Sequence, residues 1–421
     1  MILQETRSPR PLRWVLRGVS VVVTVACLVA VGRFLWPQPD PADQPGGTHR
    51  QLSFLRGAIE DGADKQAQGL FPEGYFFTNA LYGIAWVQAG LNDPARRGQA
   101  LRESRWALDR LESKAAKAVF DSQLRPAYGV FWAGWTNWLR GGVLSLDGGA
   151  DAELVRRFEA GSAEIAEAFS GSATPFLRAY PGQAWPVDST VAIASLRLHD
   201  HLRGPRFGAV VARWLEAVRP RLDPATGLLP HEVSPVDGSV KDGARATSQT
   251  MIHRFLPEID PGFARSQYAA FRRQFLAYPA GFGPGLREYP HGQGGSGDID
   301  SGPLVAGISL SATVVGLGAA RVNGDPDLAA AVGSEGELLG LPLTLPGSKR
   351  YAFGLLPIGD AFVVWSSTAR LLTAPTPPVQ DYDLRWWWRI PWLILVGLLA
   401  IAPWVRPLVR RARGNRGPAP G

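Results

Sequence analysis

Cysteine is nearly absent from this chain of 421 residues, in which only Cys27 carries a thiol. A single thiol excludes an intramolecular disulfide as a source of stability. Cys27 also lies inside an apolar segment near the N-terminus, so the long middle part of the chain has no cysteine for nucleophilic catalysis.

Acidic residues are scarce at the two ends of the chain. Residues 1–36 carry five Arg and one Glu, and residues 385–421 carry seven Arg and no acid. The two ends therefore hold +4 and +7, while residues 37–384 hold −4. Because the positive charge lies outside the main part of the chain, the basic composition does not indicate a nucleic-acid-binding protein.

Long apolar runs occur at both ends. Residues 18–36 are almost uncharged and approach the roughly 20 residues that a membrane-spanning helix needs. Residues 386–405 form a similar run, and their Trp cluster is typical of a membrane interface. Arg residues precede the first run and follow the second, so the positive-inside rule predicts a cell-membrane protein with cytoplasmic termini and an extracytoplasmic middle.

The first apolar run also has the form of a cleaved secretory signal peptide, since a basic region precedes an apolar core. The residues at its end, Gly-Arg-Phe-Leu-Trp-Pro, contain no small-x-small cleavage site. We therefore expect a retained helix and the following segments: cytoplasmic tail 1–17, transmembrane helix 18–36, linker 37–48, extracytoplasmic domain 49–371, linker 372–385, transmembrane helix 386–405 and cytoplasmic tail 406–421.

Strand signals are weak between the two apolar runs. Polar stretches with apolar residues at i, i+3, i+4 and i+7 predict helices with an exposed outer face at 95–119, 150–169, 205–218 and 263–276. Helices that are much more apolar are predicted at 75–89, 127–139, 186–198, 244–256, 299–320 and 356–371. Their starts recur every 50 to 60 residues. Six apolar inner helices paired with polar outer helices predict an all-α, two-layer closed ring of helical hairpins, about twelve helices in all.

This pattern resembles the (α/α)6 toroid superfamily, the six-hairpin glycosidases and their relatives, over residues 49–371. The motifs WPVDS, LPHEV and GDIDSGP resemble the junctions between loops and inner helices where such folds place their site residues. The resemblance implies the fold and the location of the site, and it implies no particular substrate.

The linalool dehydratase-isomerase group and the terpene cyclases share this barrel, and the sequence departs from both. The middle part of the chain has no cysteine, and the stretch from Asp298 to Ser301 lacks the last acid of the cyclase DxDD motif.

In a closed ring, the loops before the inner helices converge on a central funnel, so polar residues far apart in sequence meet there. Asp188 follows Pro186, which is typical of a first helical turn, and a glycine-rich loop from 281 to 308 carries several ionisable groups. The predicted residues for acid/base catalysis are Asp188, Asp300, Asp298 and Glu288. Aromatic rings that can stack on sugars, and polar groups of the same loops, give the predicted substrate-binding residues: Glu73, Tyr75, Trp132, Trp135, Trp185, His231, Arg245, Tyr289 and His291.

Each of these residues also has a purely structural interpretation. Glu73 could be a first-turn acid that the helix dipole favours, and Asp188 could satisfy the free backbone amides of its helix. Asp298 or Asp300 could cap a helix of residues 301–320 with Pro303 in its first turn. Trp and Phe at helical spacing are more often core residues. Arg245 could pair with a nearby acid as well as with a substrate carboxylate.

Nucleotide and metal sites are not indicated. The stretch 292–297 matches GxGxxG, but no strand precedes it and no βαβ unit surrounds it. His231 and Glu232 lack a second His at i+4, so a zincin site is unsupported, and no cofactor is expected.

The favoured hypothesis is a membrane-anchored, extracytoplasmic glycosidase-like enzyme that acts on an envelope or extracellular glycan, with Asp300 as base and Asp188 as acid. A barrel that binds or converts an isoprenoid or other lipid-borne substrate, and a non-catalytic scaffold, are the alternatives. The expected partners are the membrane and a glycan or lipid-linked substrate. The sequence does not specify the substrate, the anomeric outcome or the oligomeric state.

Overall fold

A computed structural model describes the backbone of residues 10–36 and 45–414 and the side chains of residues 14–36 and 45–405. The beginning of the predicted N-terminal tail, most of the linker at 37–48 and the last residues of the C-terminal tail lie outside the described residues.

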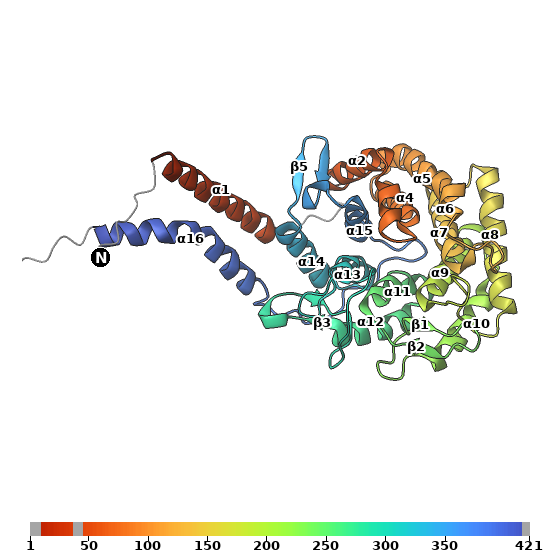
Figure 1. Ribbon diagram of the computed structural model, residues 1–421. Helices are drawn as coiled ribbons and strands as arrows, with labels where there is room; N and C mark the ends of the chain where they lie inside the picture. Colours follow the sequence, from red (N-terminus) through yellow and green to blue (C-terminus); the bar gives the residue numbers. More distant parts are fainter. Residues whose placement is uncertain (1–9, 37–44, 415–421) are drawn as a thin grey trace, which may run out of the picture.

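Six inner helices form a closed ring (Figure 1). They are α4 (Gly74–Asn92), α7 (Gly129–Asp147), α9 (Pro186–Arg203), α11 (Ala246–Ile259), α13 (Leu310–Val322) and α15 (Pro357–Ser367). Each inner helix contacts the next one along the chain, and α15 returns to contact α4. This closure confirms the predicted (α/α)6 arrangement.

Six outer helices cover the ring. They are α2 (Gly46–Glu60), α5 (Arg97–Leu111), α8 (Ala152–Gly171), α10 (Gly208–Val218), α12 (Pro261–Phe275) and α14 (Pro326–Leu339). The first packs on α15, and the other five pack on α4, α7, α9, α11 and α13 in turn. Shorter elements in the loops are α3 (Ala63–Leu70), α6 (Lys114–Lys117) and the 3-10 turns η1 (Pro94–Arg96), η2 (Arg219–Arg221), η3 (Pro279–Gly281) and η4 (Ala352–Gly354).

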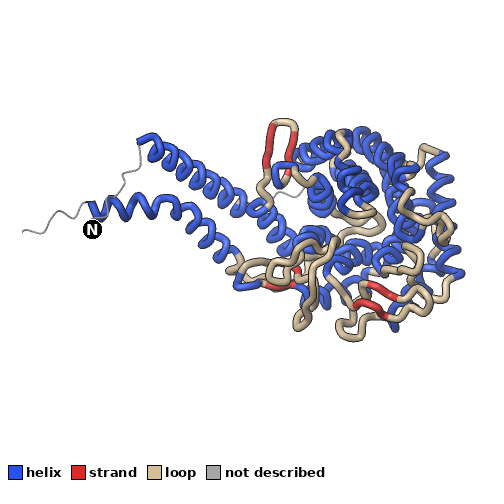
Figure 2. The backbone as a smooth tube through the Cα atoms, viewed as in Figure 1, coloured by secondary structure: helices blue, strands red, loops and turns tan. Residues whose placement is uncertain are grey.

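Strands are few and short, as Figure 2 shows. The described residues contain three antiparallel pairs: β1 (Glu232–Val233) with β2 (Val240–Asp242), β3 (Leu276–Ala277) with β4 (Gly285–Leu286), and β5 (Leu343–Leu345) with β6 (Ser348–Arg350). All three lie in connections between helices, so they leave the helical ring intact.

The burial pattern explains why the helices separate into two layers. Residues of α4 are buried on every side, whereas α5 buries one stripe of small and apolar residues and exposes its charged ones. Small residues let the inner helices approach closely: a side-chain Cβ at Gly134 of α7 would lie 3.0 Å from the backbone nitrogen of Ala192 in α9. The ring therefore depends on glycine where two inner backbones cross.

The prediction of a helix that begins at residue 299 was wrong. Helix α13 begins eleven residues later, at Leu310, and Ser309 is its N-cap, accepting a hydrogen bond from the backbone nitrogen of Ala312 at 3.2 Å. The preceding loop contains left-handed turns at Gly302, Ala306 and Gly307, which a helix cannot accommodate. Asp298, Asp300 and Pro303 thus belong to this loop, and neither aspartate caps a helix.

Two terminal helices lie side by side away from the ring (Figure 1). They are α1 (Arg10–Leu35) and α16 (Arg389–Gly414), and α1 also contacts α14. The hydroxyl of Thr24 donates to the carbonyl of Ala400 at 3.0 Å, and the indole of Trp404 donates to Thr24 at 2.9 Å. Residues 14–35 are long and apolar enough to cross a membrane, with a mean hydropathy of 2.2, whereas the apolar part of α16, residues 389–405, is shorter.

We expect Gly134→Val to weaken the ring, because the new methyl groups meet the backbone of α9 and backbone atoms cannot move aside. Overpacking of this kind costs about 1–3 kcal/mol of unfolding free energy, which chemical denaturation followed by circular dichroism measures. The control is Gly57→Val in α2, since a Cβ at Gly57 meets no atom within 4 Å. Equal stability of the two variants would contradict the close approach.

Candidate active site

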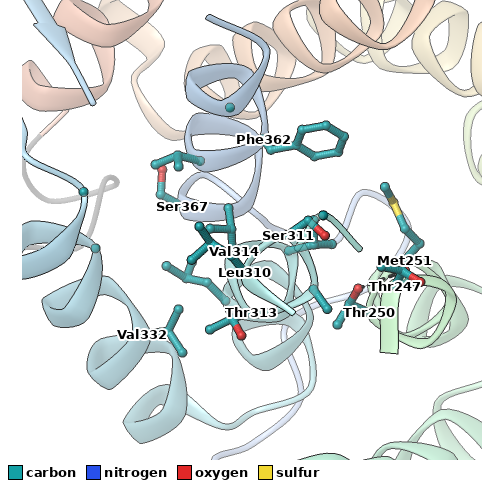
Figure 3. A pocket seen from close by; sticks show the side chains of 18 of the residues that line it. Thr247, Thr250, Met251, Leu310, Ser311, Thr313, Val314, Val332, Phe362 and Ser367 are labelled. Carbon is teal, nitrogen blue, oxygen red and sulfur yellow. Dashed lines mark hydrogen bonds between the residues drawn. The ribbon is translucent and has the colours of Figure 1, made fainter. Parts of the chain in front are cut away.

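A cavity of about 2010 Å³ reaches into the ring. Its wall includes residues at or next to the N-terminal ends of α4, α9, α11 and α13, namely Glu73, Asp188, Thr247 and Ser311. Figure 3 shows part of this wall, with Met251 of α11 and Phe362 of α15 on one side of α13. The volume exceeds the roughly 300–1,000 Å³ of a usual small-molecule pocket, so the cavity suits an extended ligand.

Six acidic residues of the described chain line this cavity, and three of them, Glu73, Asp188 and Asp300, lie at the starts of α4 and α9 and on the loop before α13. The negative charges of Glu73 and Asp300 both raise the pKa of Asp188, and the charge of Glu73 also raises the pKa of Asp300. The three groups therefore form one electrostatically coupled cluster, called the acid cluster below.

Asp188 is the most buried member of the acid cluster. It lies in the first turn of α9 behind Pro186, as predicted, and its side chain is 5% exposed. Within the described part of the chain its carboxyl group accepts no hydrogen bond, so it does not serve the free amides of the helix end. Burial raises its pKa well above the usual range, and the two neighbouring carboxylates raise it further.

Asp300 lies on the loop before α13, and the starts of two inner helices hold this loop. The hydroxyl of Ser311 donates to the carbonyl of Asp300 at 2.6 Å, and that of Ser309 donates to the carbonyl of Ser301 at 3.0 Å. From α11, Arg245 binds Asp298, whose other oxygen accepts the backbone amides of Asp300 and Ser301 at 3.1 and 2.9 Å. These contacts hold the backbone at Asp300 in place, while its side chain remains open to solvent.

The pKa of Asp300 is raised to about 6. Asp300 is exposed where it faces the cavity, but the protein around it desolvates its carboxyl group. This desolvation is the largest cause, followed by the charges of Asp298 and Glu73, while Arg245 acts in the opposite direction. The cluster therefore combines Asp188, whose raised pKa favours the protonated form, with Asp300, whose pKa is raised to about 6.

Glu73 immediately precedes α4 and accepts a hydrogen bond from the phenol of Tyr180. Burial raises the pKa of Tyr180, and the negative charge of Glu73 raises it further, so the phenol remains a donor. The Tyr180 ring stacks on Phe120 at 5.8 Å and meets Trp185 edge-on at 5.7 Å. These contacts fix the carboxylate of Glu73 beside Asp188.

Glu288 does not line the cavity. It is fully buried, and its Oε1 accepts hydrogen bonds from the guanidinium of Arg245 and the hydroxyl of Thr247, both at 2.8 Å. Arg245 lies 2.5 Å from Asp298 on its other side. Arg245 therefore joins Glu288 to Asp298, the pairing with nearby acids that was the structural interpretation of this arginine.

Aromatic side chains form one wall of the cavity. Phe77 is at the centre of this wall, with ring centroids 5.2 Å from Phe131, 5.5 Å from Trp135 and 5.8 Å from Phe362. These four rings and Trp185 all line the cavity. Trp135 and Phe131 are almost fully buried, so Phe77, Phe362 and Trp185 offer the accessible flat apolar area, which suits stacking on a sugar face.

Among the remaining predicted binding residues, His231 lines the cavity and the others do not. The Nδ1 of His231 lies 2.5 Å from the hydroxyl of Ser248. Burial lowers the pKa of His231 to about 4, assisted by the charge of Arg245, so its ring is neutral near pH 7.

The others lie outside the cavity. Tyr75 and Trp132 are core residues: Arg110 stacks on the Tyr75 ring, and the Trp132 indole donates to the carbonyl of Leu111 at 3.1 Å. Tyr289 and His291 bond to backbone carbonyls of the glycine-rich loop region and of β3. These four contacts support the structural interpretation of these side chains.

The sequence predictions missed Tyr180, Phe77, Phe131 and Phe362. Tyr180 and Glu73 are 107 residues apart, and no local pattern connects them. The available signal was the position of Tyr180 in the loop just before α9, since loops before inner helices face the cavity.

No group of three or more His, Cys, Asp or Glu side chains is placed to hold a metal ion in the part of the chain that the structure describes.

Comparisons with known proteins give matches among solved structures only. No protein-family model matches the chain, and no curated protein matches it. Among solved structures, the ring is similar to a selenomethionine derivative of a GH76 alpha-mannanase from Bacteroides thetaiotaomicron, with 13% sequence identity and a TM-score of 0.43. The match covers 69% of this chain and 84% of the mannanase chain.

We expect Arg245→Gln to destabilise the protein strongly, because Glu288 would keep a buried charge without its cation. Breaking a buried ion pair in this way costs about 3–5 kcal/mol, measurable as a loss of unfolding free energy. Arg156→Gln is the control, because Arg156 pairs with Glu153 on the exposed face of α8, and it should cost less than about 1 kcal/mol. The double variant Arg245→Gln/Glu288→Gln should recover part of the loss, and a strictly additive effect would contradict the pairing.

Proposed function

We propose that this protein is a membrane-anchored, extracytoplasmic glycosidase-like enzyme. The observation that carries this proposal is the acid cluster, in which Asp188 and Asp300 share one cavity and have pKa values raised to different extents. Hydrolysis between sugars needs a protonated carboxyl group and an ionised one at the same bond.

The roles follow from the two environments. Asp188 is the acid: it gives its proton to the leaving glycosidic oxygen as the bond to the anomeric carbon breaks. Asp300 is the base: it takes a proton from the water whose oxygen bonds to that carbon. Water reaches Asp300 because this side chain is open to solvent, whereas Asp188 is buried.

Glu73 supports the acid without exchanging a proton. Its charge disfavours ionisation of Asp188, and the hydrogen bond from Tyr180 holds it in place. Trp185, Phe77 and Phe362 position the sugar by stacking.

Arg245, Asp298 and Glu288 position the loop of Asp300. This assignment replaces the expectation that Asp298 or Glu288 takes part in the reaction, since the side chains of both are bound to Arg245.

The membrane location rests on the two terminal helices. Large apolar side chains on their surfaces are exposed, including Val22, Leu28, Leu398 and Ile401. Pairing α16 with α1 places a shorter apolar helix beside one long enough to span, and basic residues lie at the far ends of both. A membrane hairpin with both termini cytoplasmic explains these features together.

Conversion of an isoprenoid is the second candidate, favoured by the large apolar part of the same cavity. The acid cluster weighs against it, because a carboxylate open to water such as Asp300 would quench a carbocation. A non-catalytic scaffold has no use for a buried carboxyl group without a hydrogen-bond partner.

Asp300→Asn and Asp188→Asn should each lower glycan turnover by at least about 10²-fold, because acid/base assistance contributes 10²–10⁴-fold. The measurement is the release of new reducing ends from a panel of α- and β-linked oligosaccharides by the full chain. Thermal unfolding should change little. Asp61→Asn, at an exposed residue outside the cavity, is the matched control. A fully folded wild type that cleaves no linkage, or an Asp300→Asn variant that retains turnover, would overturn the proposal.

The pH profile of kcat/KM should be bell-shaped. Activity rises with pH as Asp300 ionises, with a midpoint near its pKa of about 6, and falls at higher pH as Asp188 loses its proton. Glu73→Gln removes a negative charge that raises both pKa values, so both limbs should move to lower pH. Glu167→Gln, at an exposed position on α8, should leave both limbs unchanged. Limbs that move in opposite directions in Glu73→Gln would contradict the coupling.

A further inference from the structure

The cavity extends from the acid cluster into an apolar branch between three helices. In α13, Leu310, Val314 and Leu317 form one stripe at helical spacing, and all three line the cavity. The facing stripes are Val332, Gly336 and Leu339 of α14, and Gly359, Val363 and Ser367 of α15. Figure 3 shows Val332 on the side of α13 that carries Leu310 and Val314, with Ser367 above them.

Some apolar side chains of this branch pack in the core, as Val332 does in a cluster that Leu317 also contacts, but others remain exposed. Leu310 is 68% exposed, Leu339 50% and Leu356 49%, although all three line the cavity. Each square ångström of such surface that a ligand covers is favourable by about 25 cal/mol. An open space lined by three apolar stripes therefore selects a long hydrocarbon rather than a polar chain.

The same branch reaches the terminal helices. Trp392 and Leu395 of α16 line the cavity together with Glu335 of α14, and the Trp392 indole donates to Glu335 at 2.9 Å. Burial raises the pKa of Glu335 to about 8, so the protonated form of this carboxyl group is favoured near pH 7. One edge of the branch is thus formed by the helix that we assign to the membrane.

Exposed apolar side chains also lie next to residues that line the cavity. Leu341 follows the lining residue Gly340, and its neighbour Pro342 accepts a hydrogen bond from Arg33 of α1 at 2.6 Å. Phe353 and Leu355 are exposed beside the lining residues Ala352 and Leu356. Since α1 leaves the ring next to Pro342, Leu341 lies where a membrane surface would meet the domain.

We propose that the apolar branch binds the hydrocarbon chain of a membrane lipid that carries the glycan on its polar end. This inference rests on the proposed function and specifies its substrate class. The lipid chain enters beside α1 and α16, lies between α13, α14 and α15, and places the attached sugar at Asp188 and Asp300. Both components of the cavity, the acid cluster and the apolar branch, are then occupied by one molecule.

Photo-crosslinking tests the occupant directly. The full chain is reconstituted in phosphatidylglycerol vesicles that contain 1 mol% of an alkyl glucoside with a diazirine near the end of its C16 chain, and labelled peptides are mapped by mass spectrometry. We expect labels on α13 and α14 at residues of the branch, such as Val314 and Val332, in addition to labels on α1 and α16. Labels confined to α1 and α16 would overturn the inference.

Gly336→Leu provides the matched variant, because a Cβ at Gly336 meets no atom within 4 Å and the added side chain fills the branch. We expect branch labelling to fall by at least fivefold. Gly57→Leu is the control: Gly57 is also a half-buried helical glycine with open space around it, and it lies outside the cavity. Equal loss of labelling in both variants would show a general effect on folding and would overturn the inference.

Turnover separates this inference from the proposed function. With a soluble oligosaccharide and the same oligosaccharide on a C16 chain, Gly336→Leu should lower kcat/KM at least tenfold for the second only, whereas Asp300→Asn should abolish both. Labelling does not require turnover, so branch labels without any hydrolysis would refute the glycosidase and leave the lipid site standing. Hydrolysis without branch labels would refute the lipid site and leave the glycosidase standing.

Discussion

The buried guanidinium of Arg245 is the interaction on which the rest of the site depends. It lies at the start of α11 and binds Glu288 inside the protein and Asp298 in the loop that carries Asp300. Because α11 belongs to the closed ring, this ion pair anchors the glycine-rich loop before α13 to a rigid part of the protein. A loop with several left-handed residues is otherwise costly to order. The cation therefore stabilises one conformation of the loop and neutralises part of the negative charge beside Asp300.

The two aspartates differ because the ring gives them different surroundings. Asp188 lies on an inner helix, where the surrounding helices bury its side chain. Asp300 lies on a loop, and its side chain is exposed. Carboxyl groups with the same intrinsic chemistry thus obtain different proton affinities from their positions in the fold. The phenol of Tyr180 donates a hydrogen bond to the third carboxylate, Glu73, and holds it in position. Such a division of environments is what acid/base catalysis by two carboxyl groups requires.

Local signals made part of this structure predictable. High apolar content and regularly recurring starts marked the six inner helices, and Pro186 marked the first turn of α9, so Asp188 was placed correctly. The start of α13 was not, because the hydroxyls of Ser309 and Ser311 reach back to residues 300 and 301 and hold them as a loop. The pairing of Glu73 with Tyr180 joins segments 107 residues apart. Contacts of this kind depend on ring closure, and no window of sequence contains both partners.

Ring closure also has a consequence for synthesis of the chain. Helix α4 is complete at Asn92, but its last neighbour in the ring, α15, begins at Pro357. At 5–20 residues per second the ribosome needs on the order of tens of seconds to produce the intervening segment. During that interval α4 presents an apolar face without its partner, and the phenylalanines of the cavity wall lack Phe362. The nascent chain therefore carries an unpaired apolar face until its sixth hairpin emerges, and truncation after the fifth hairpin leaves that surface permanently open.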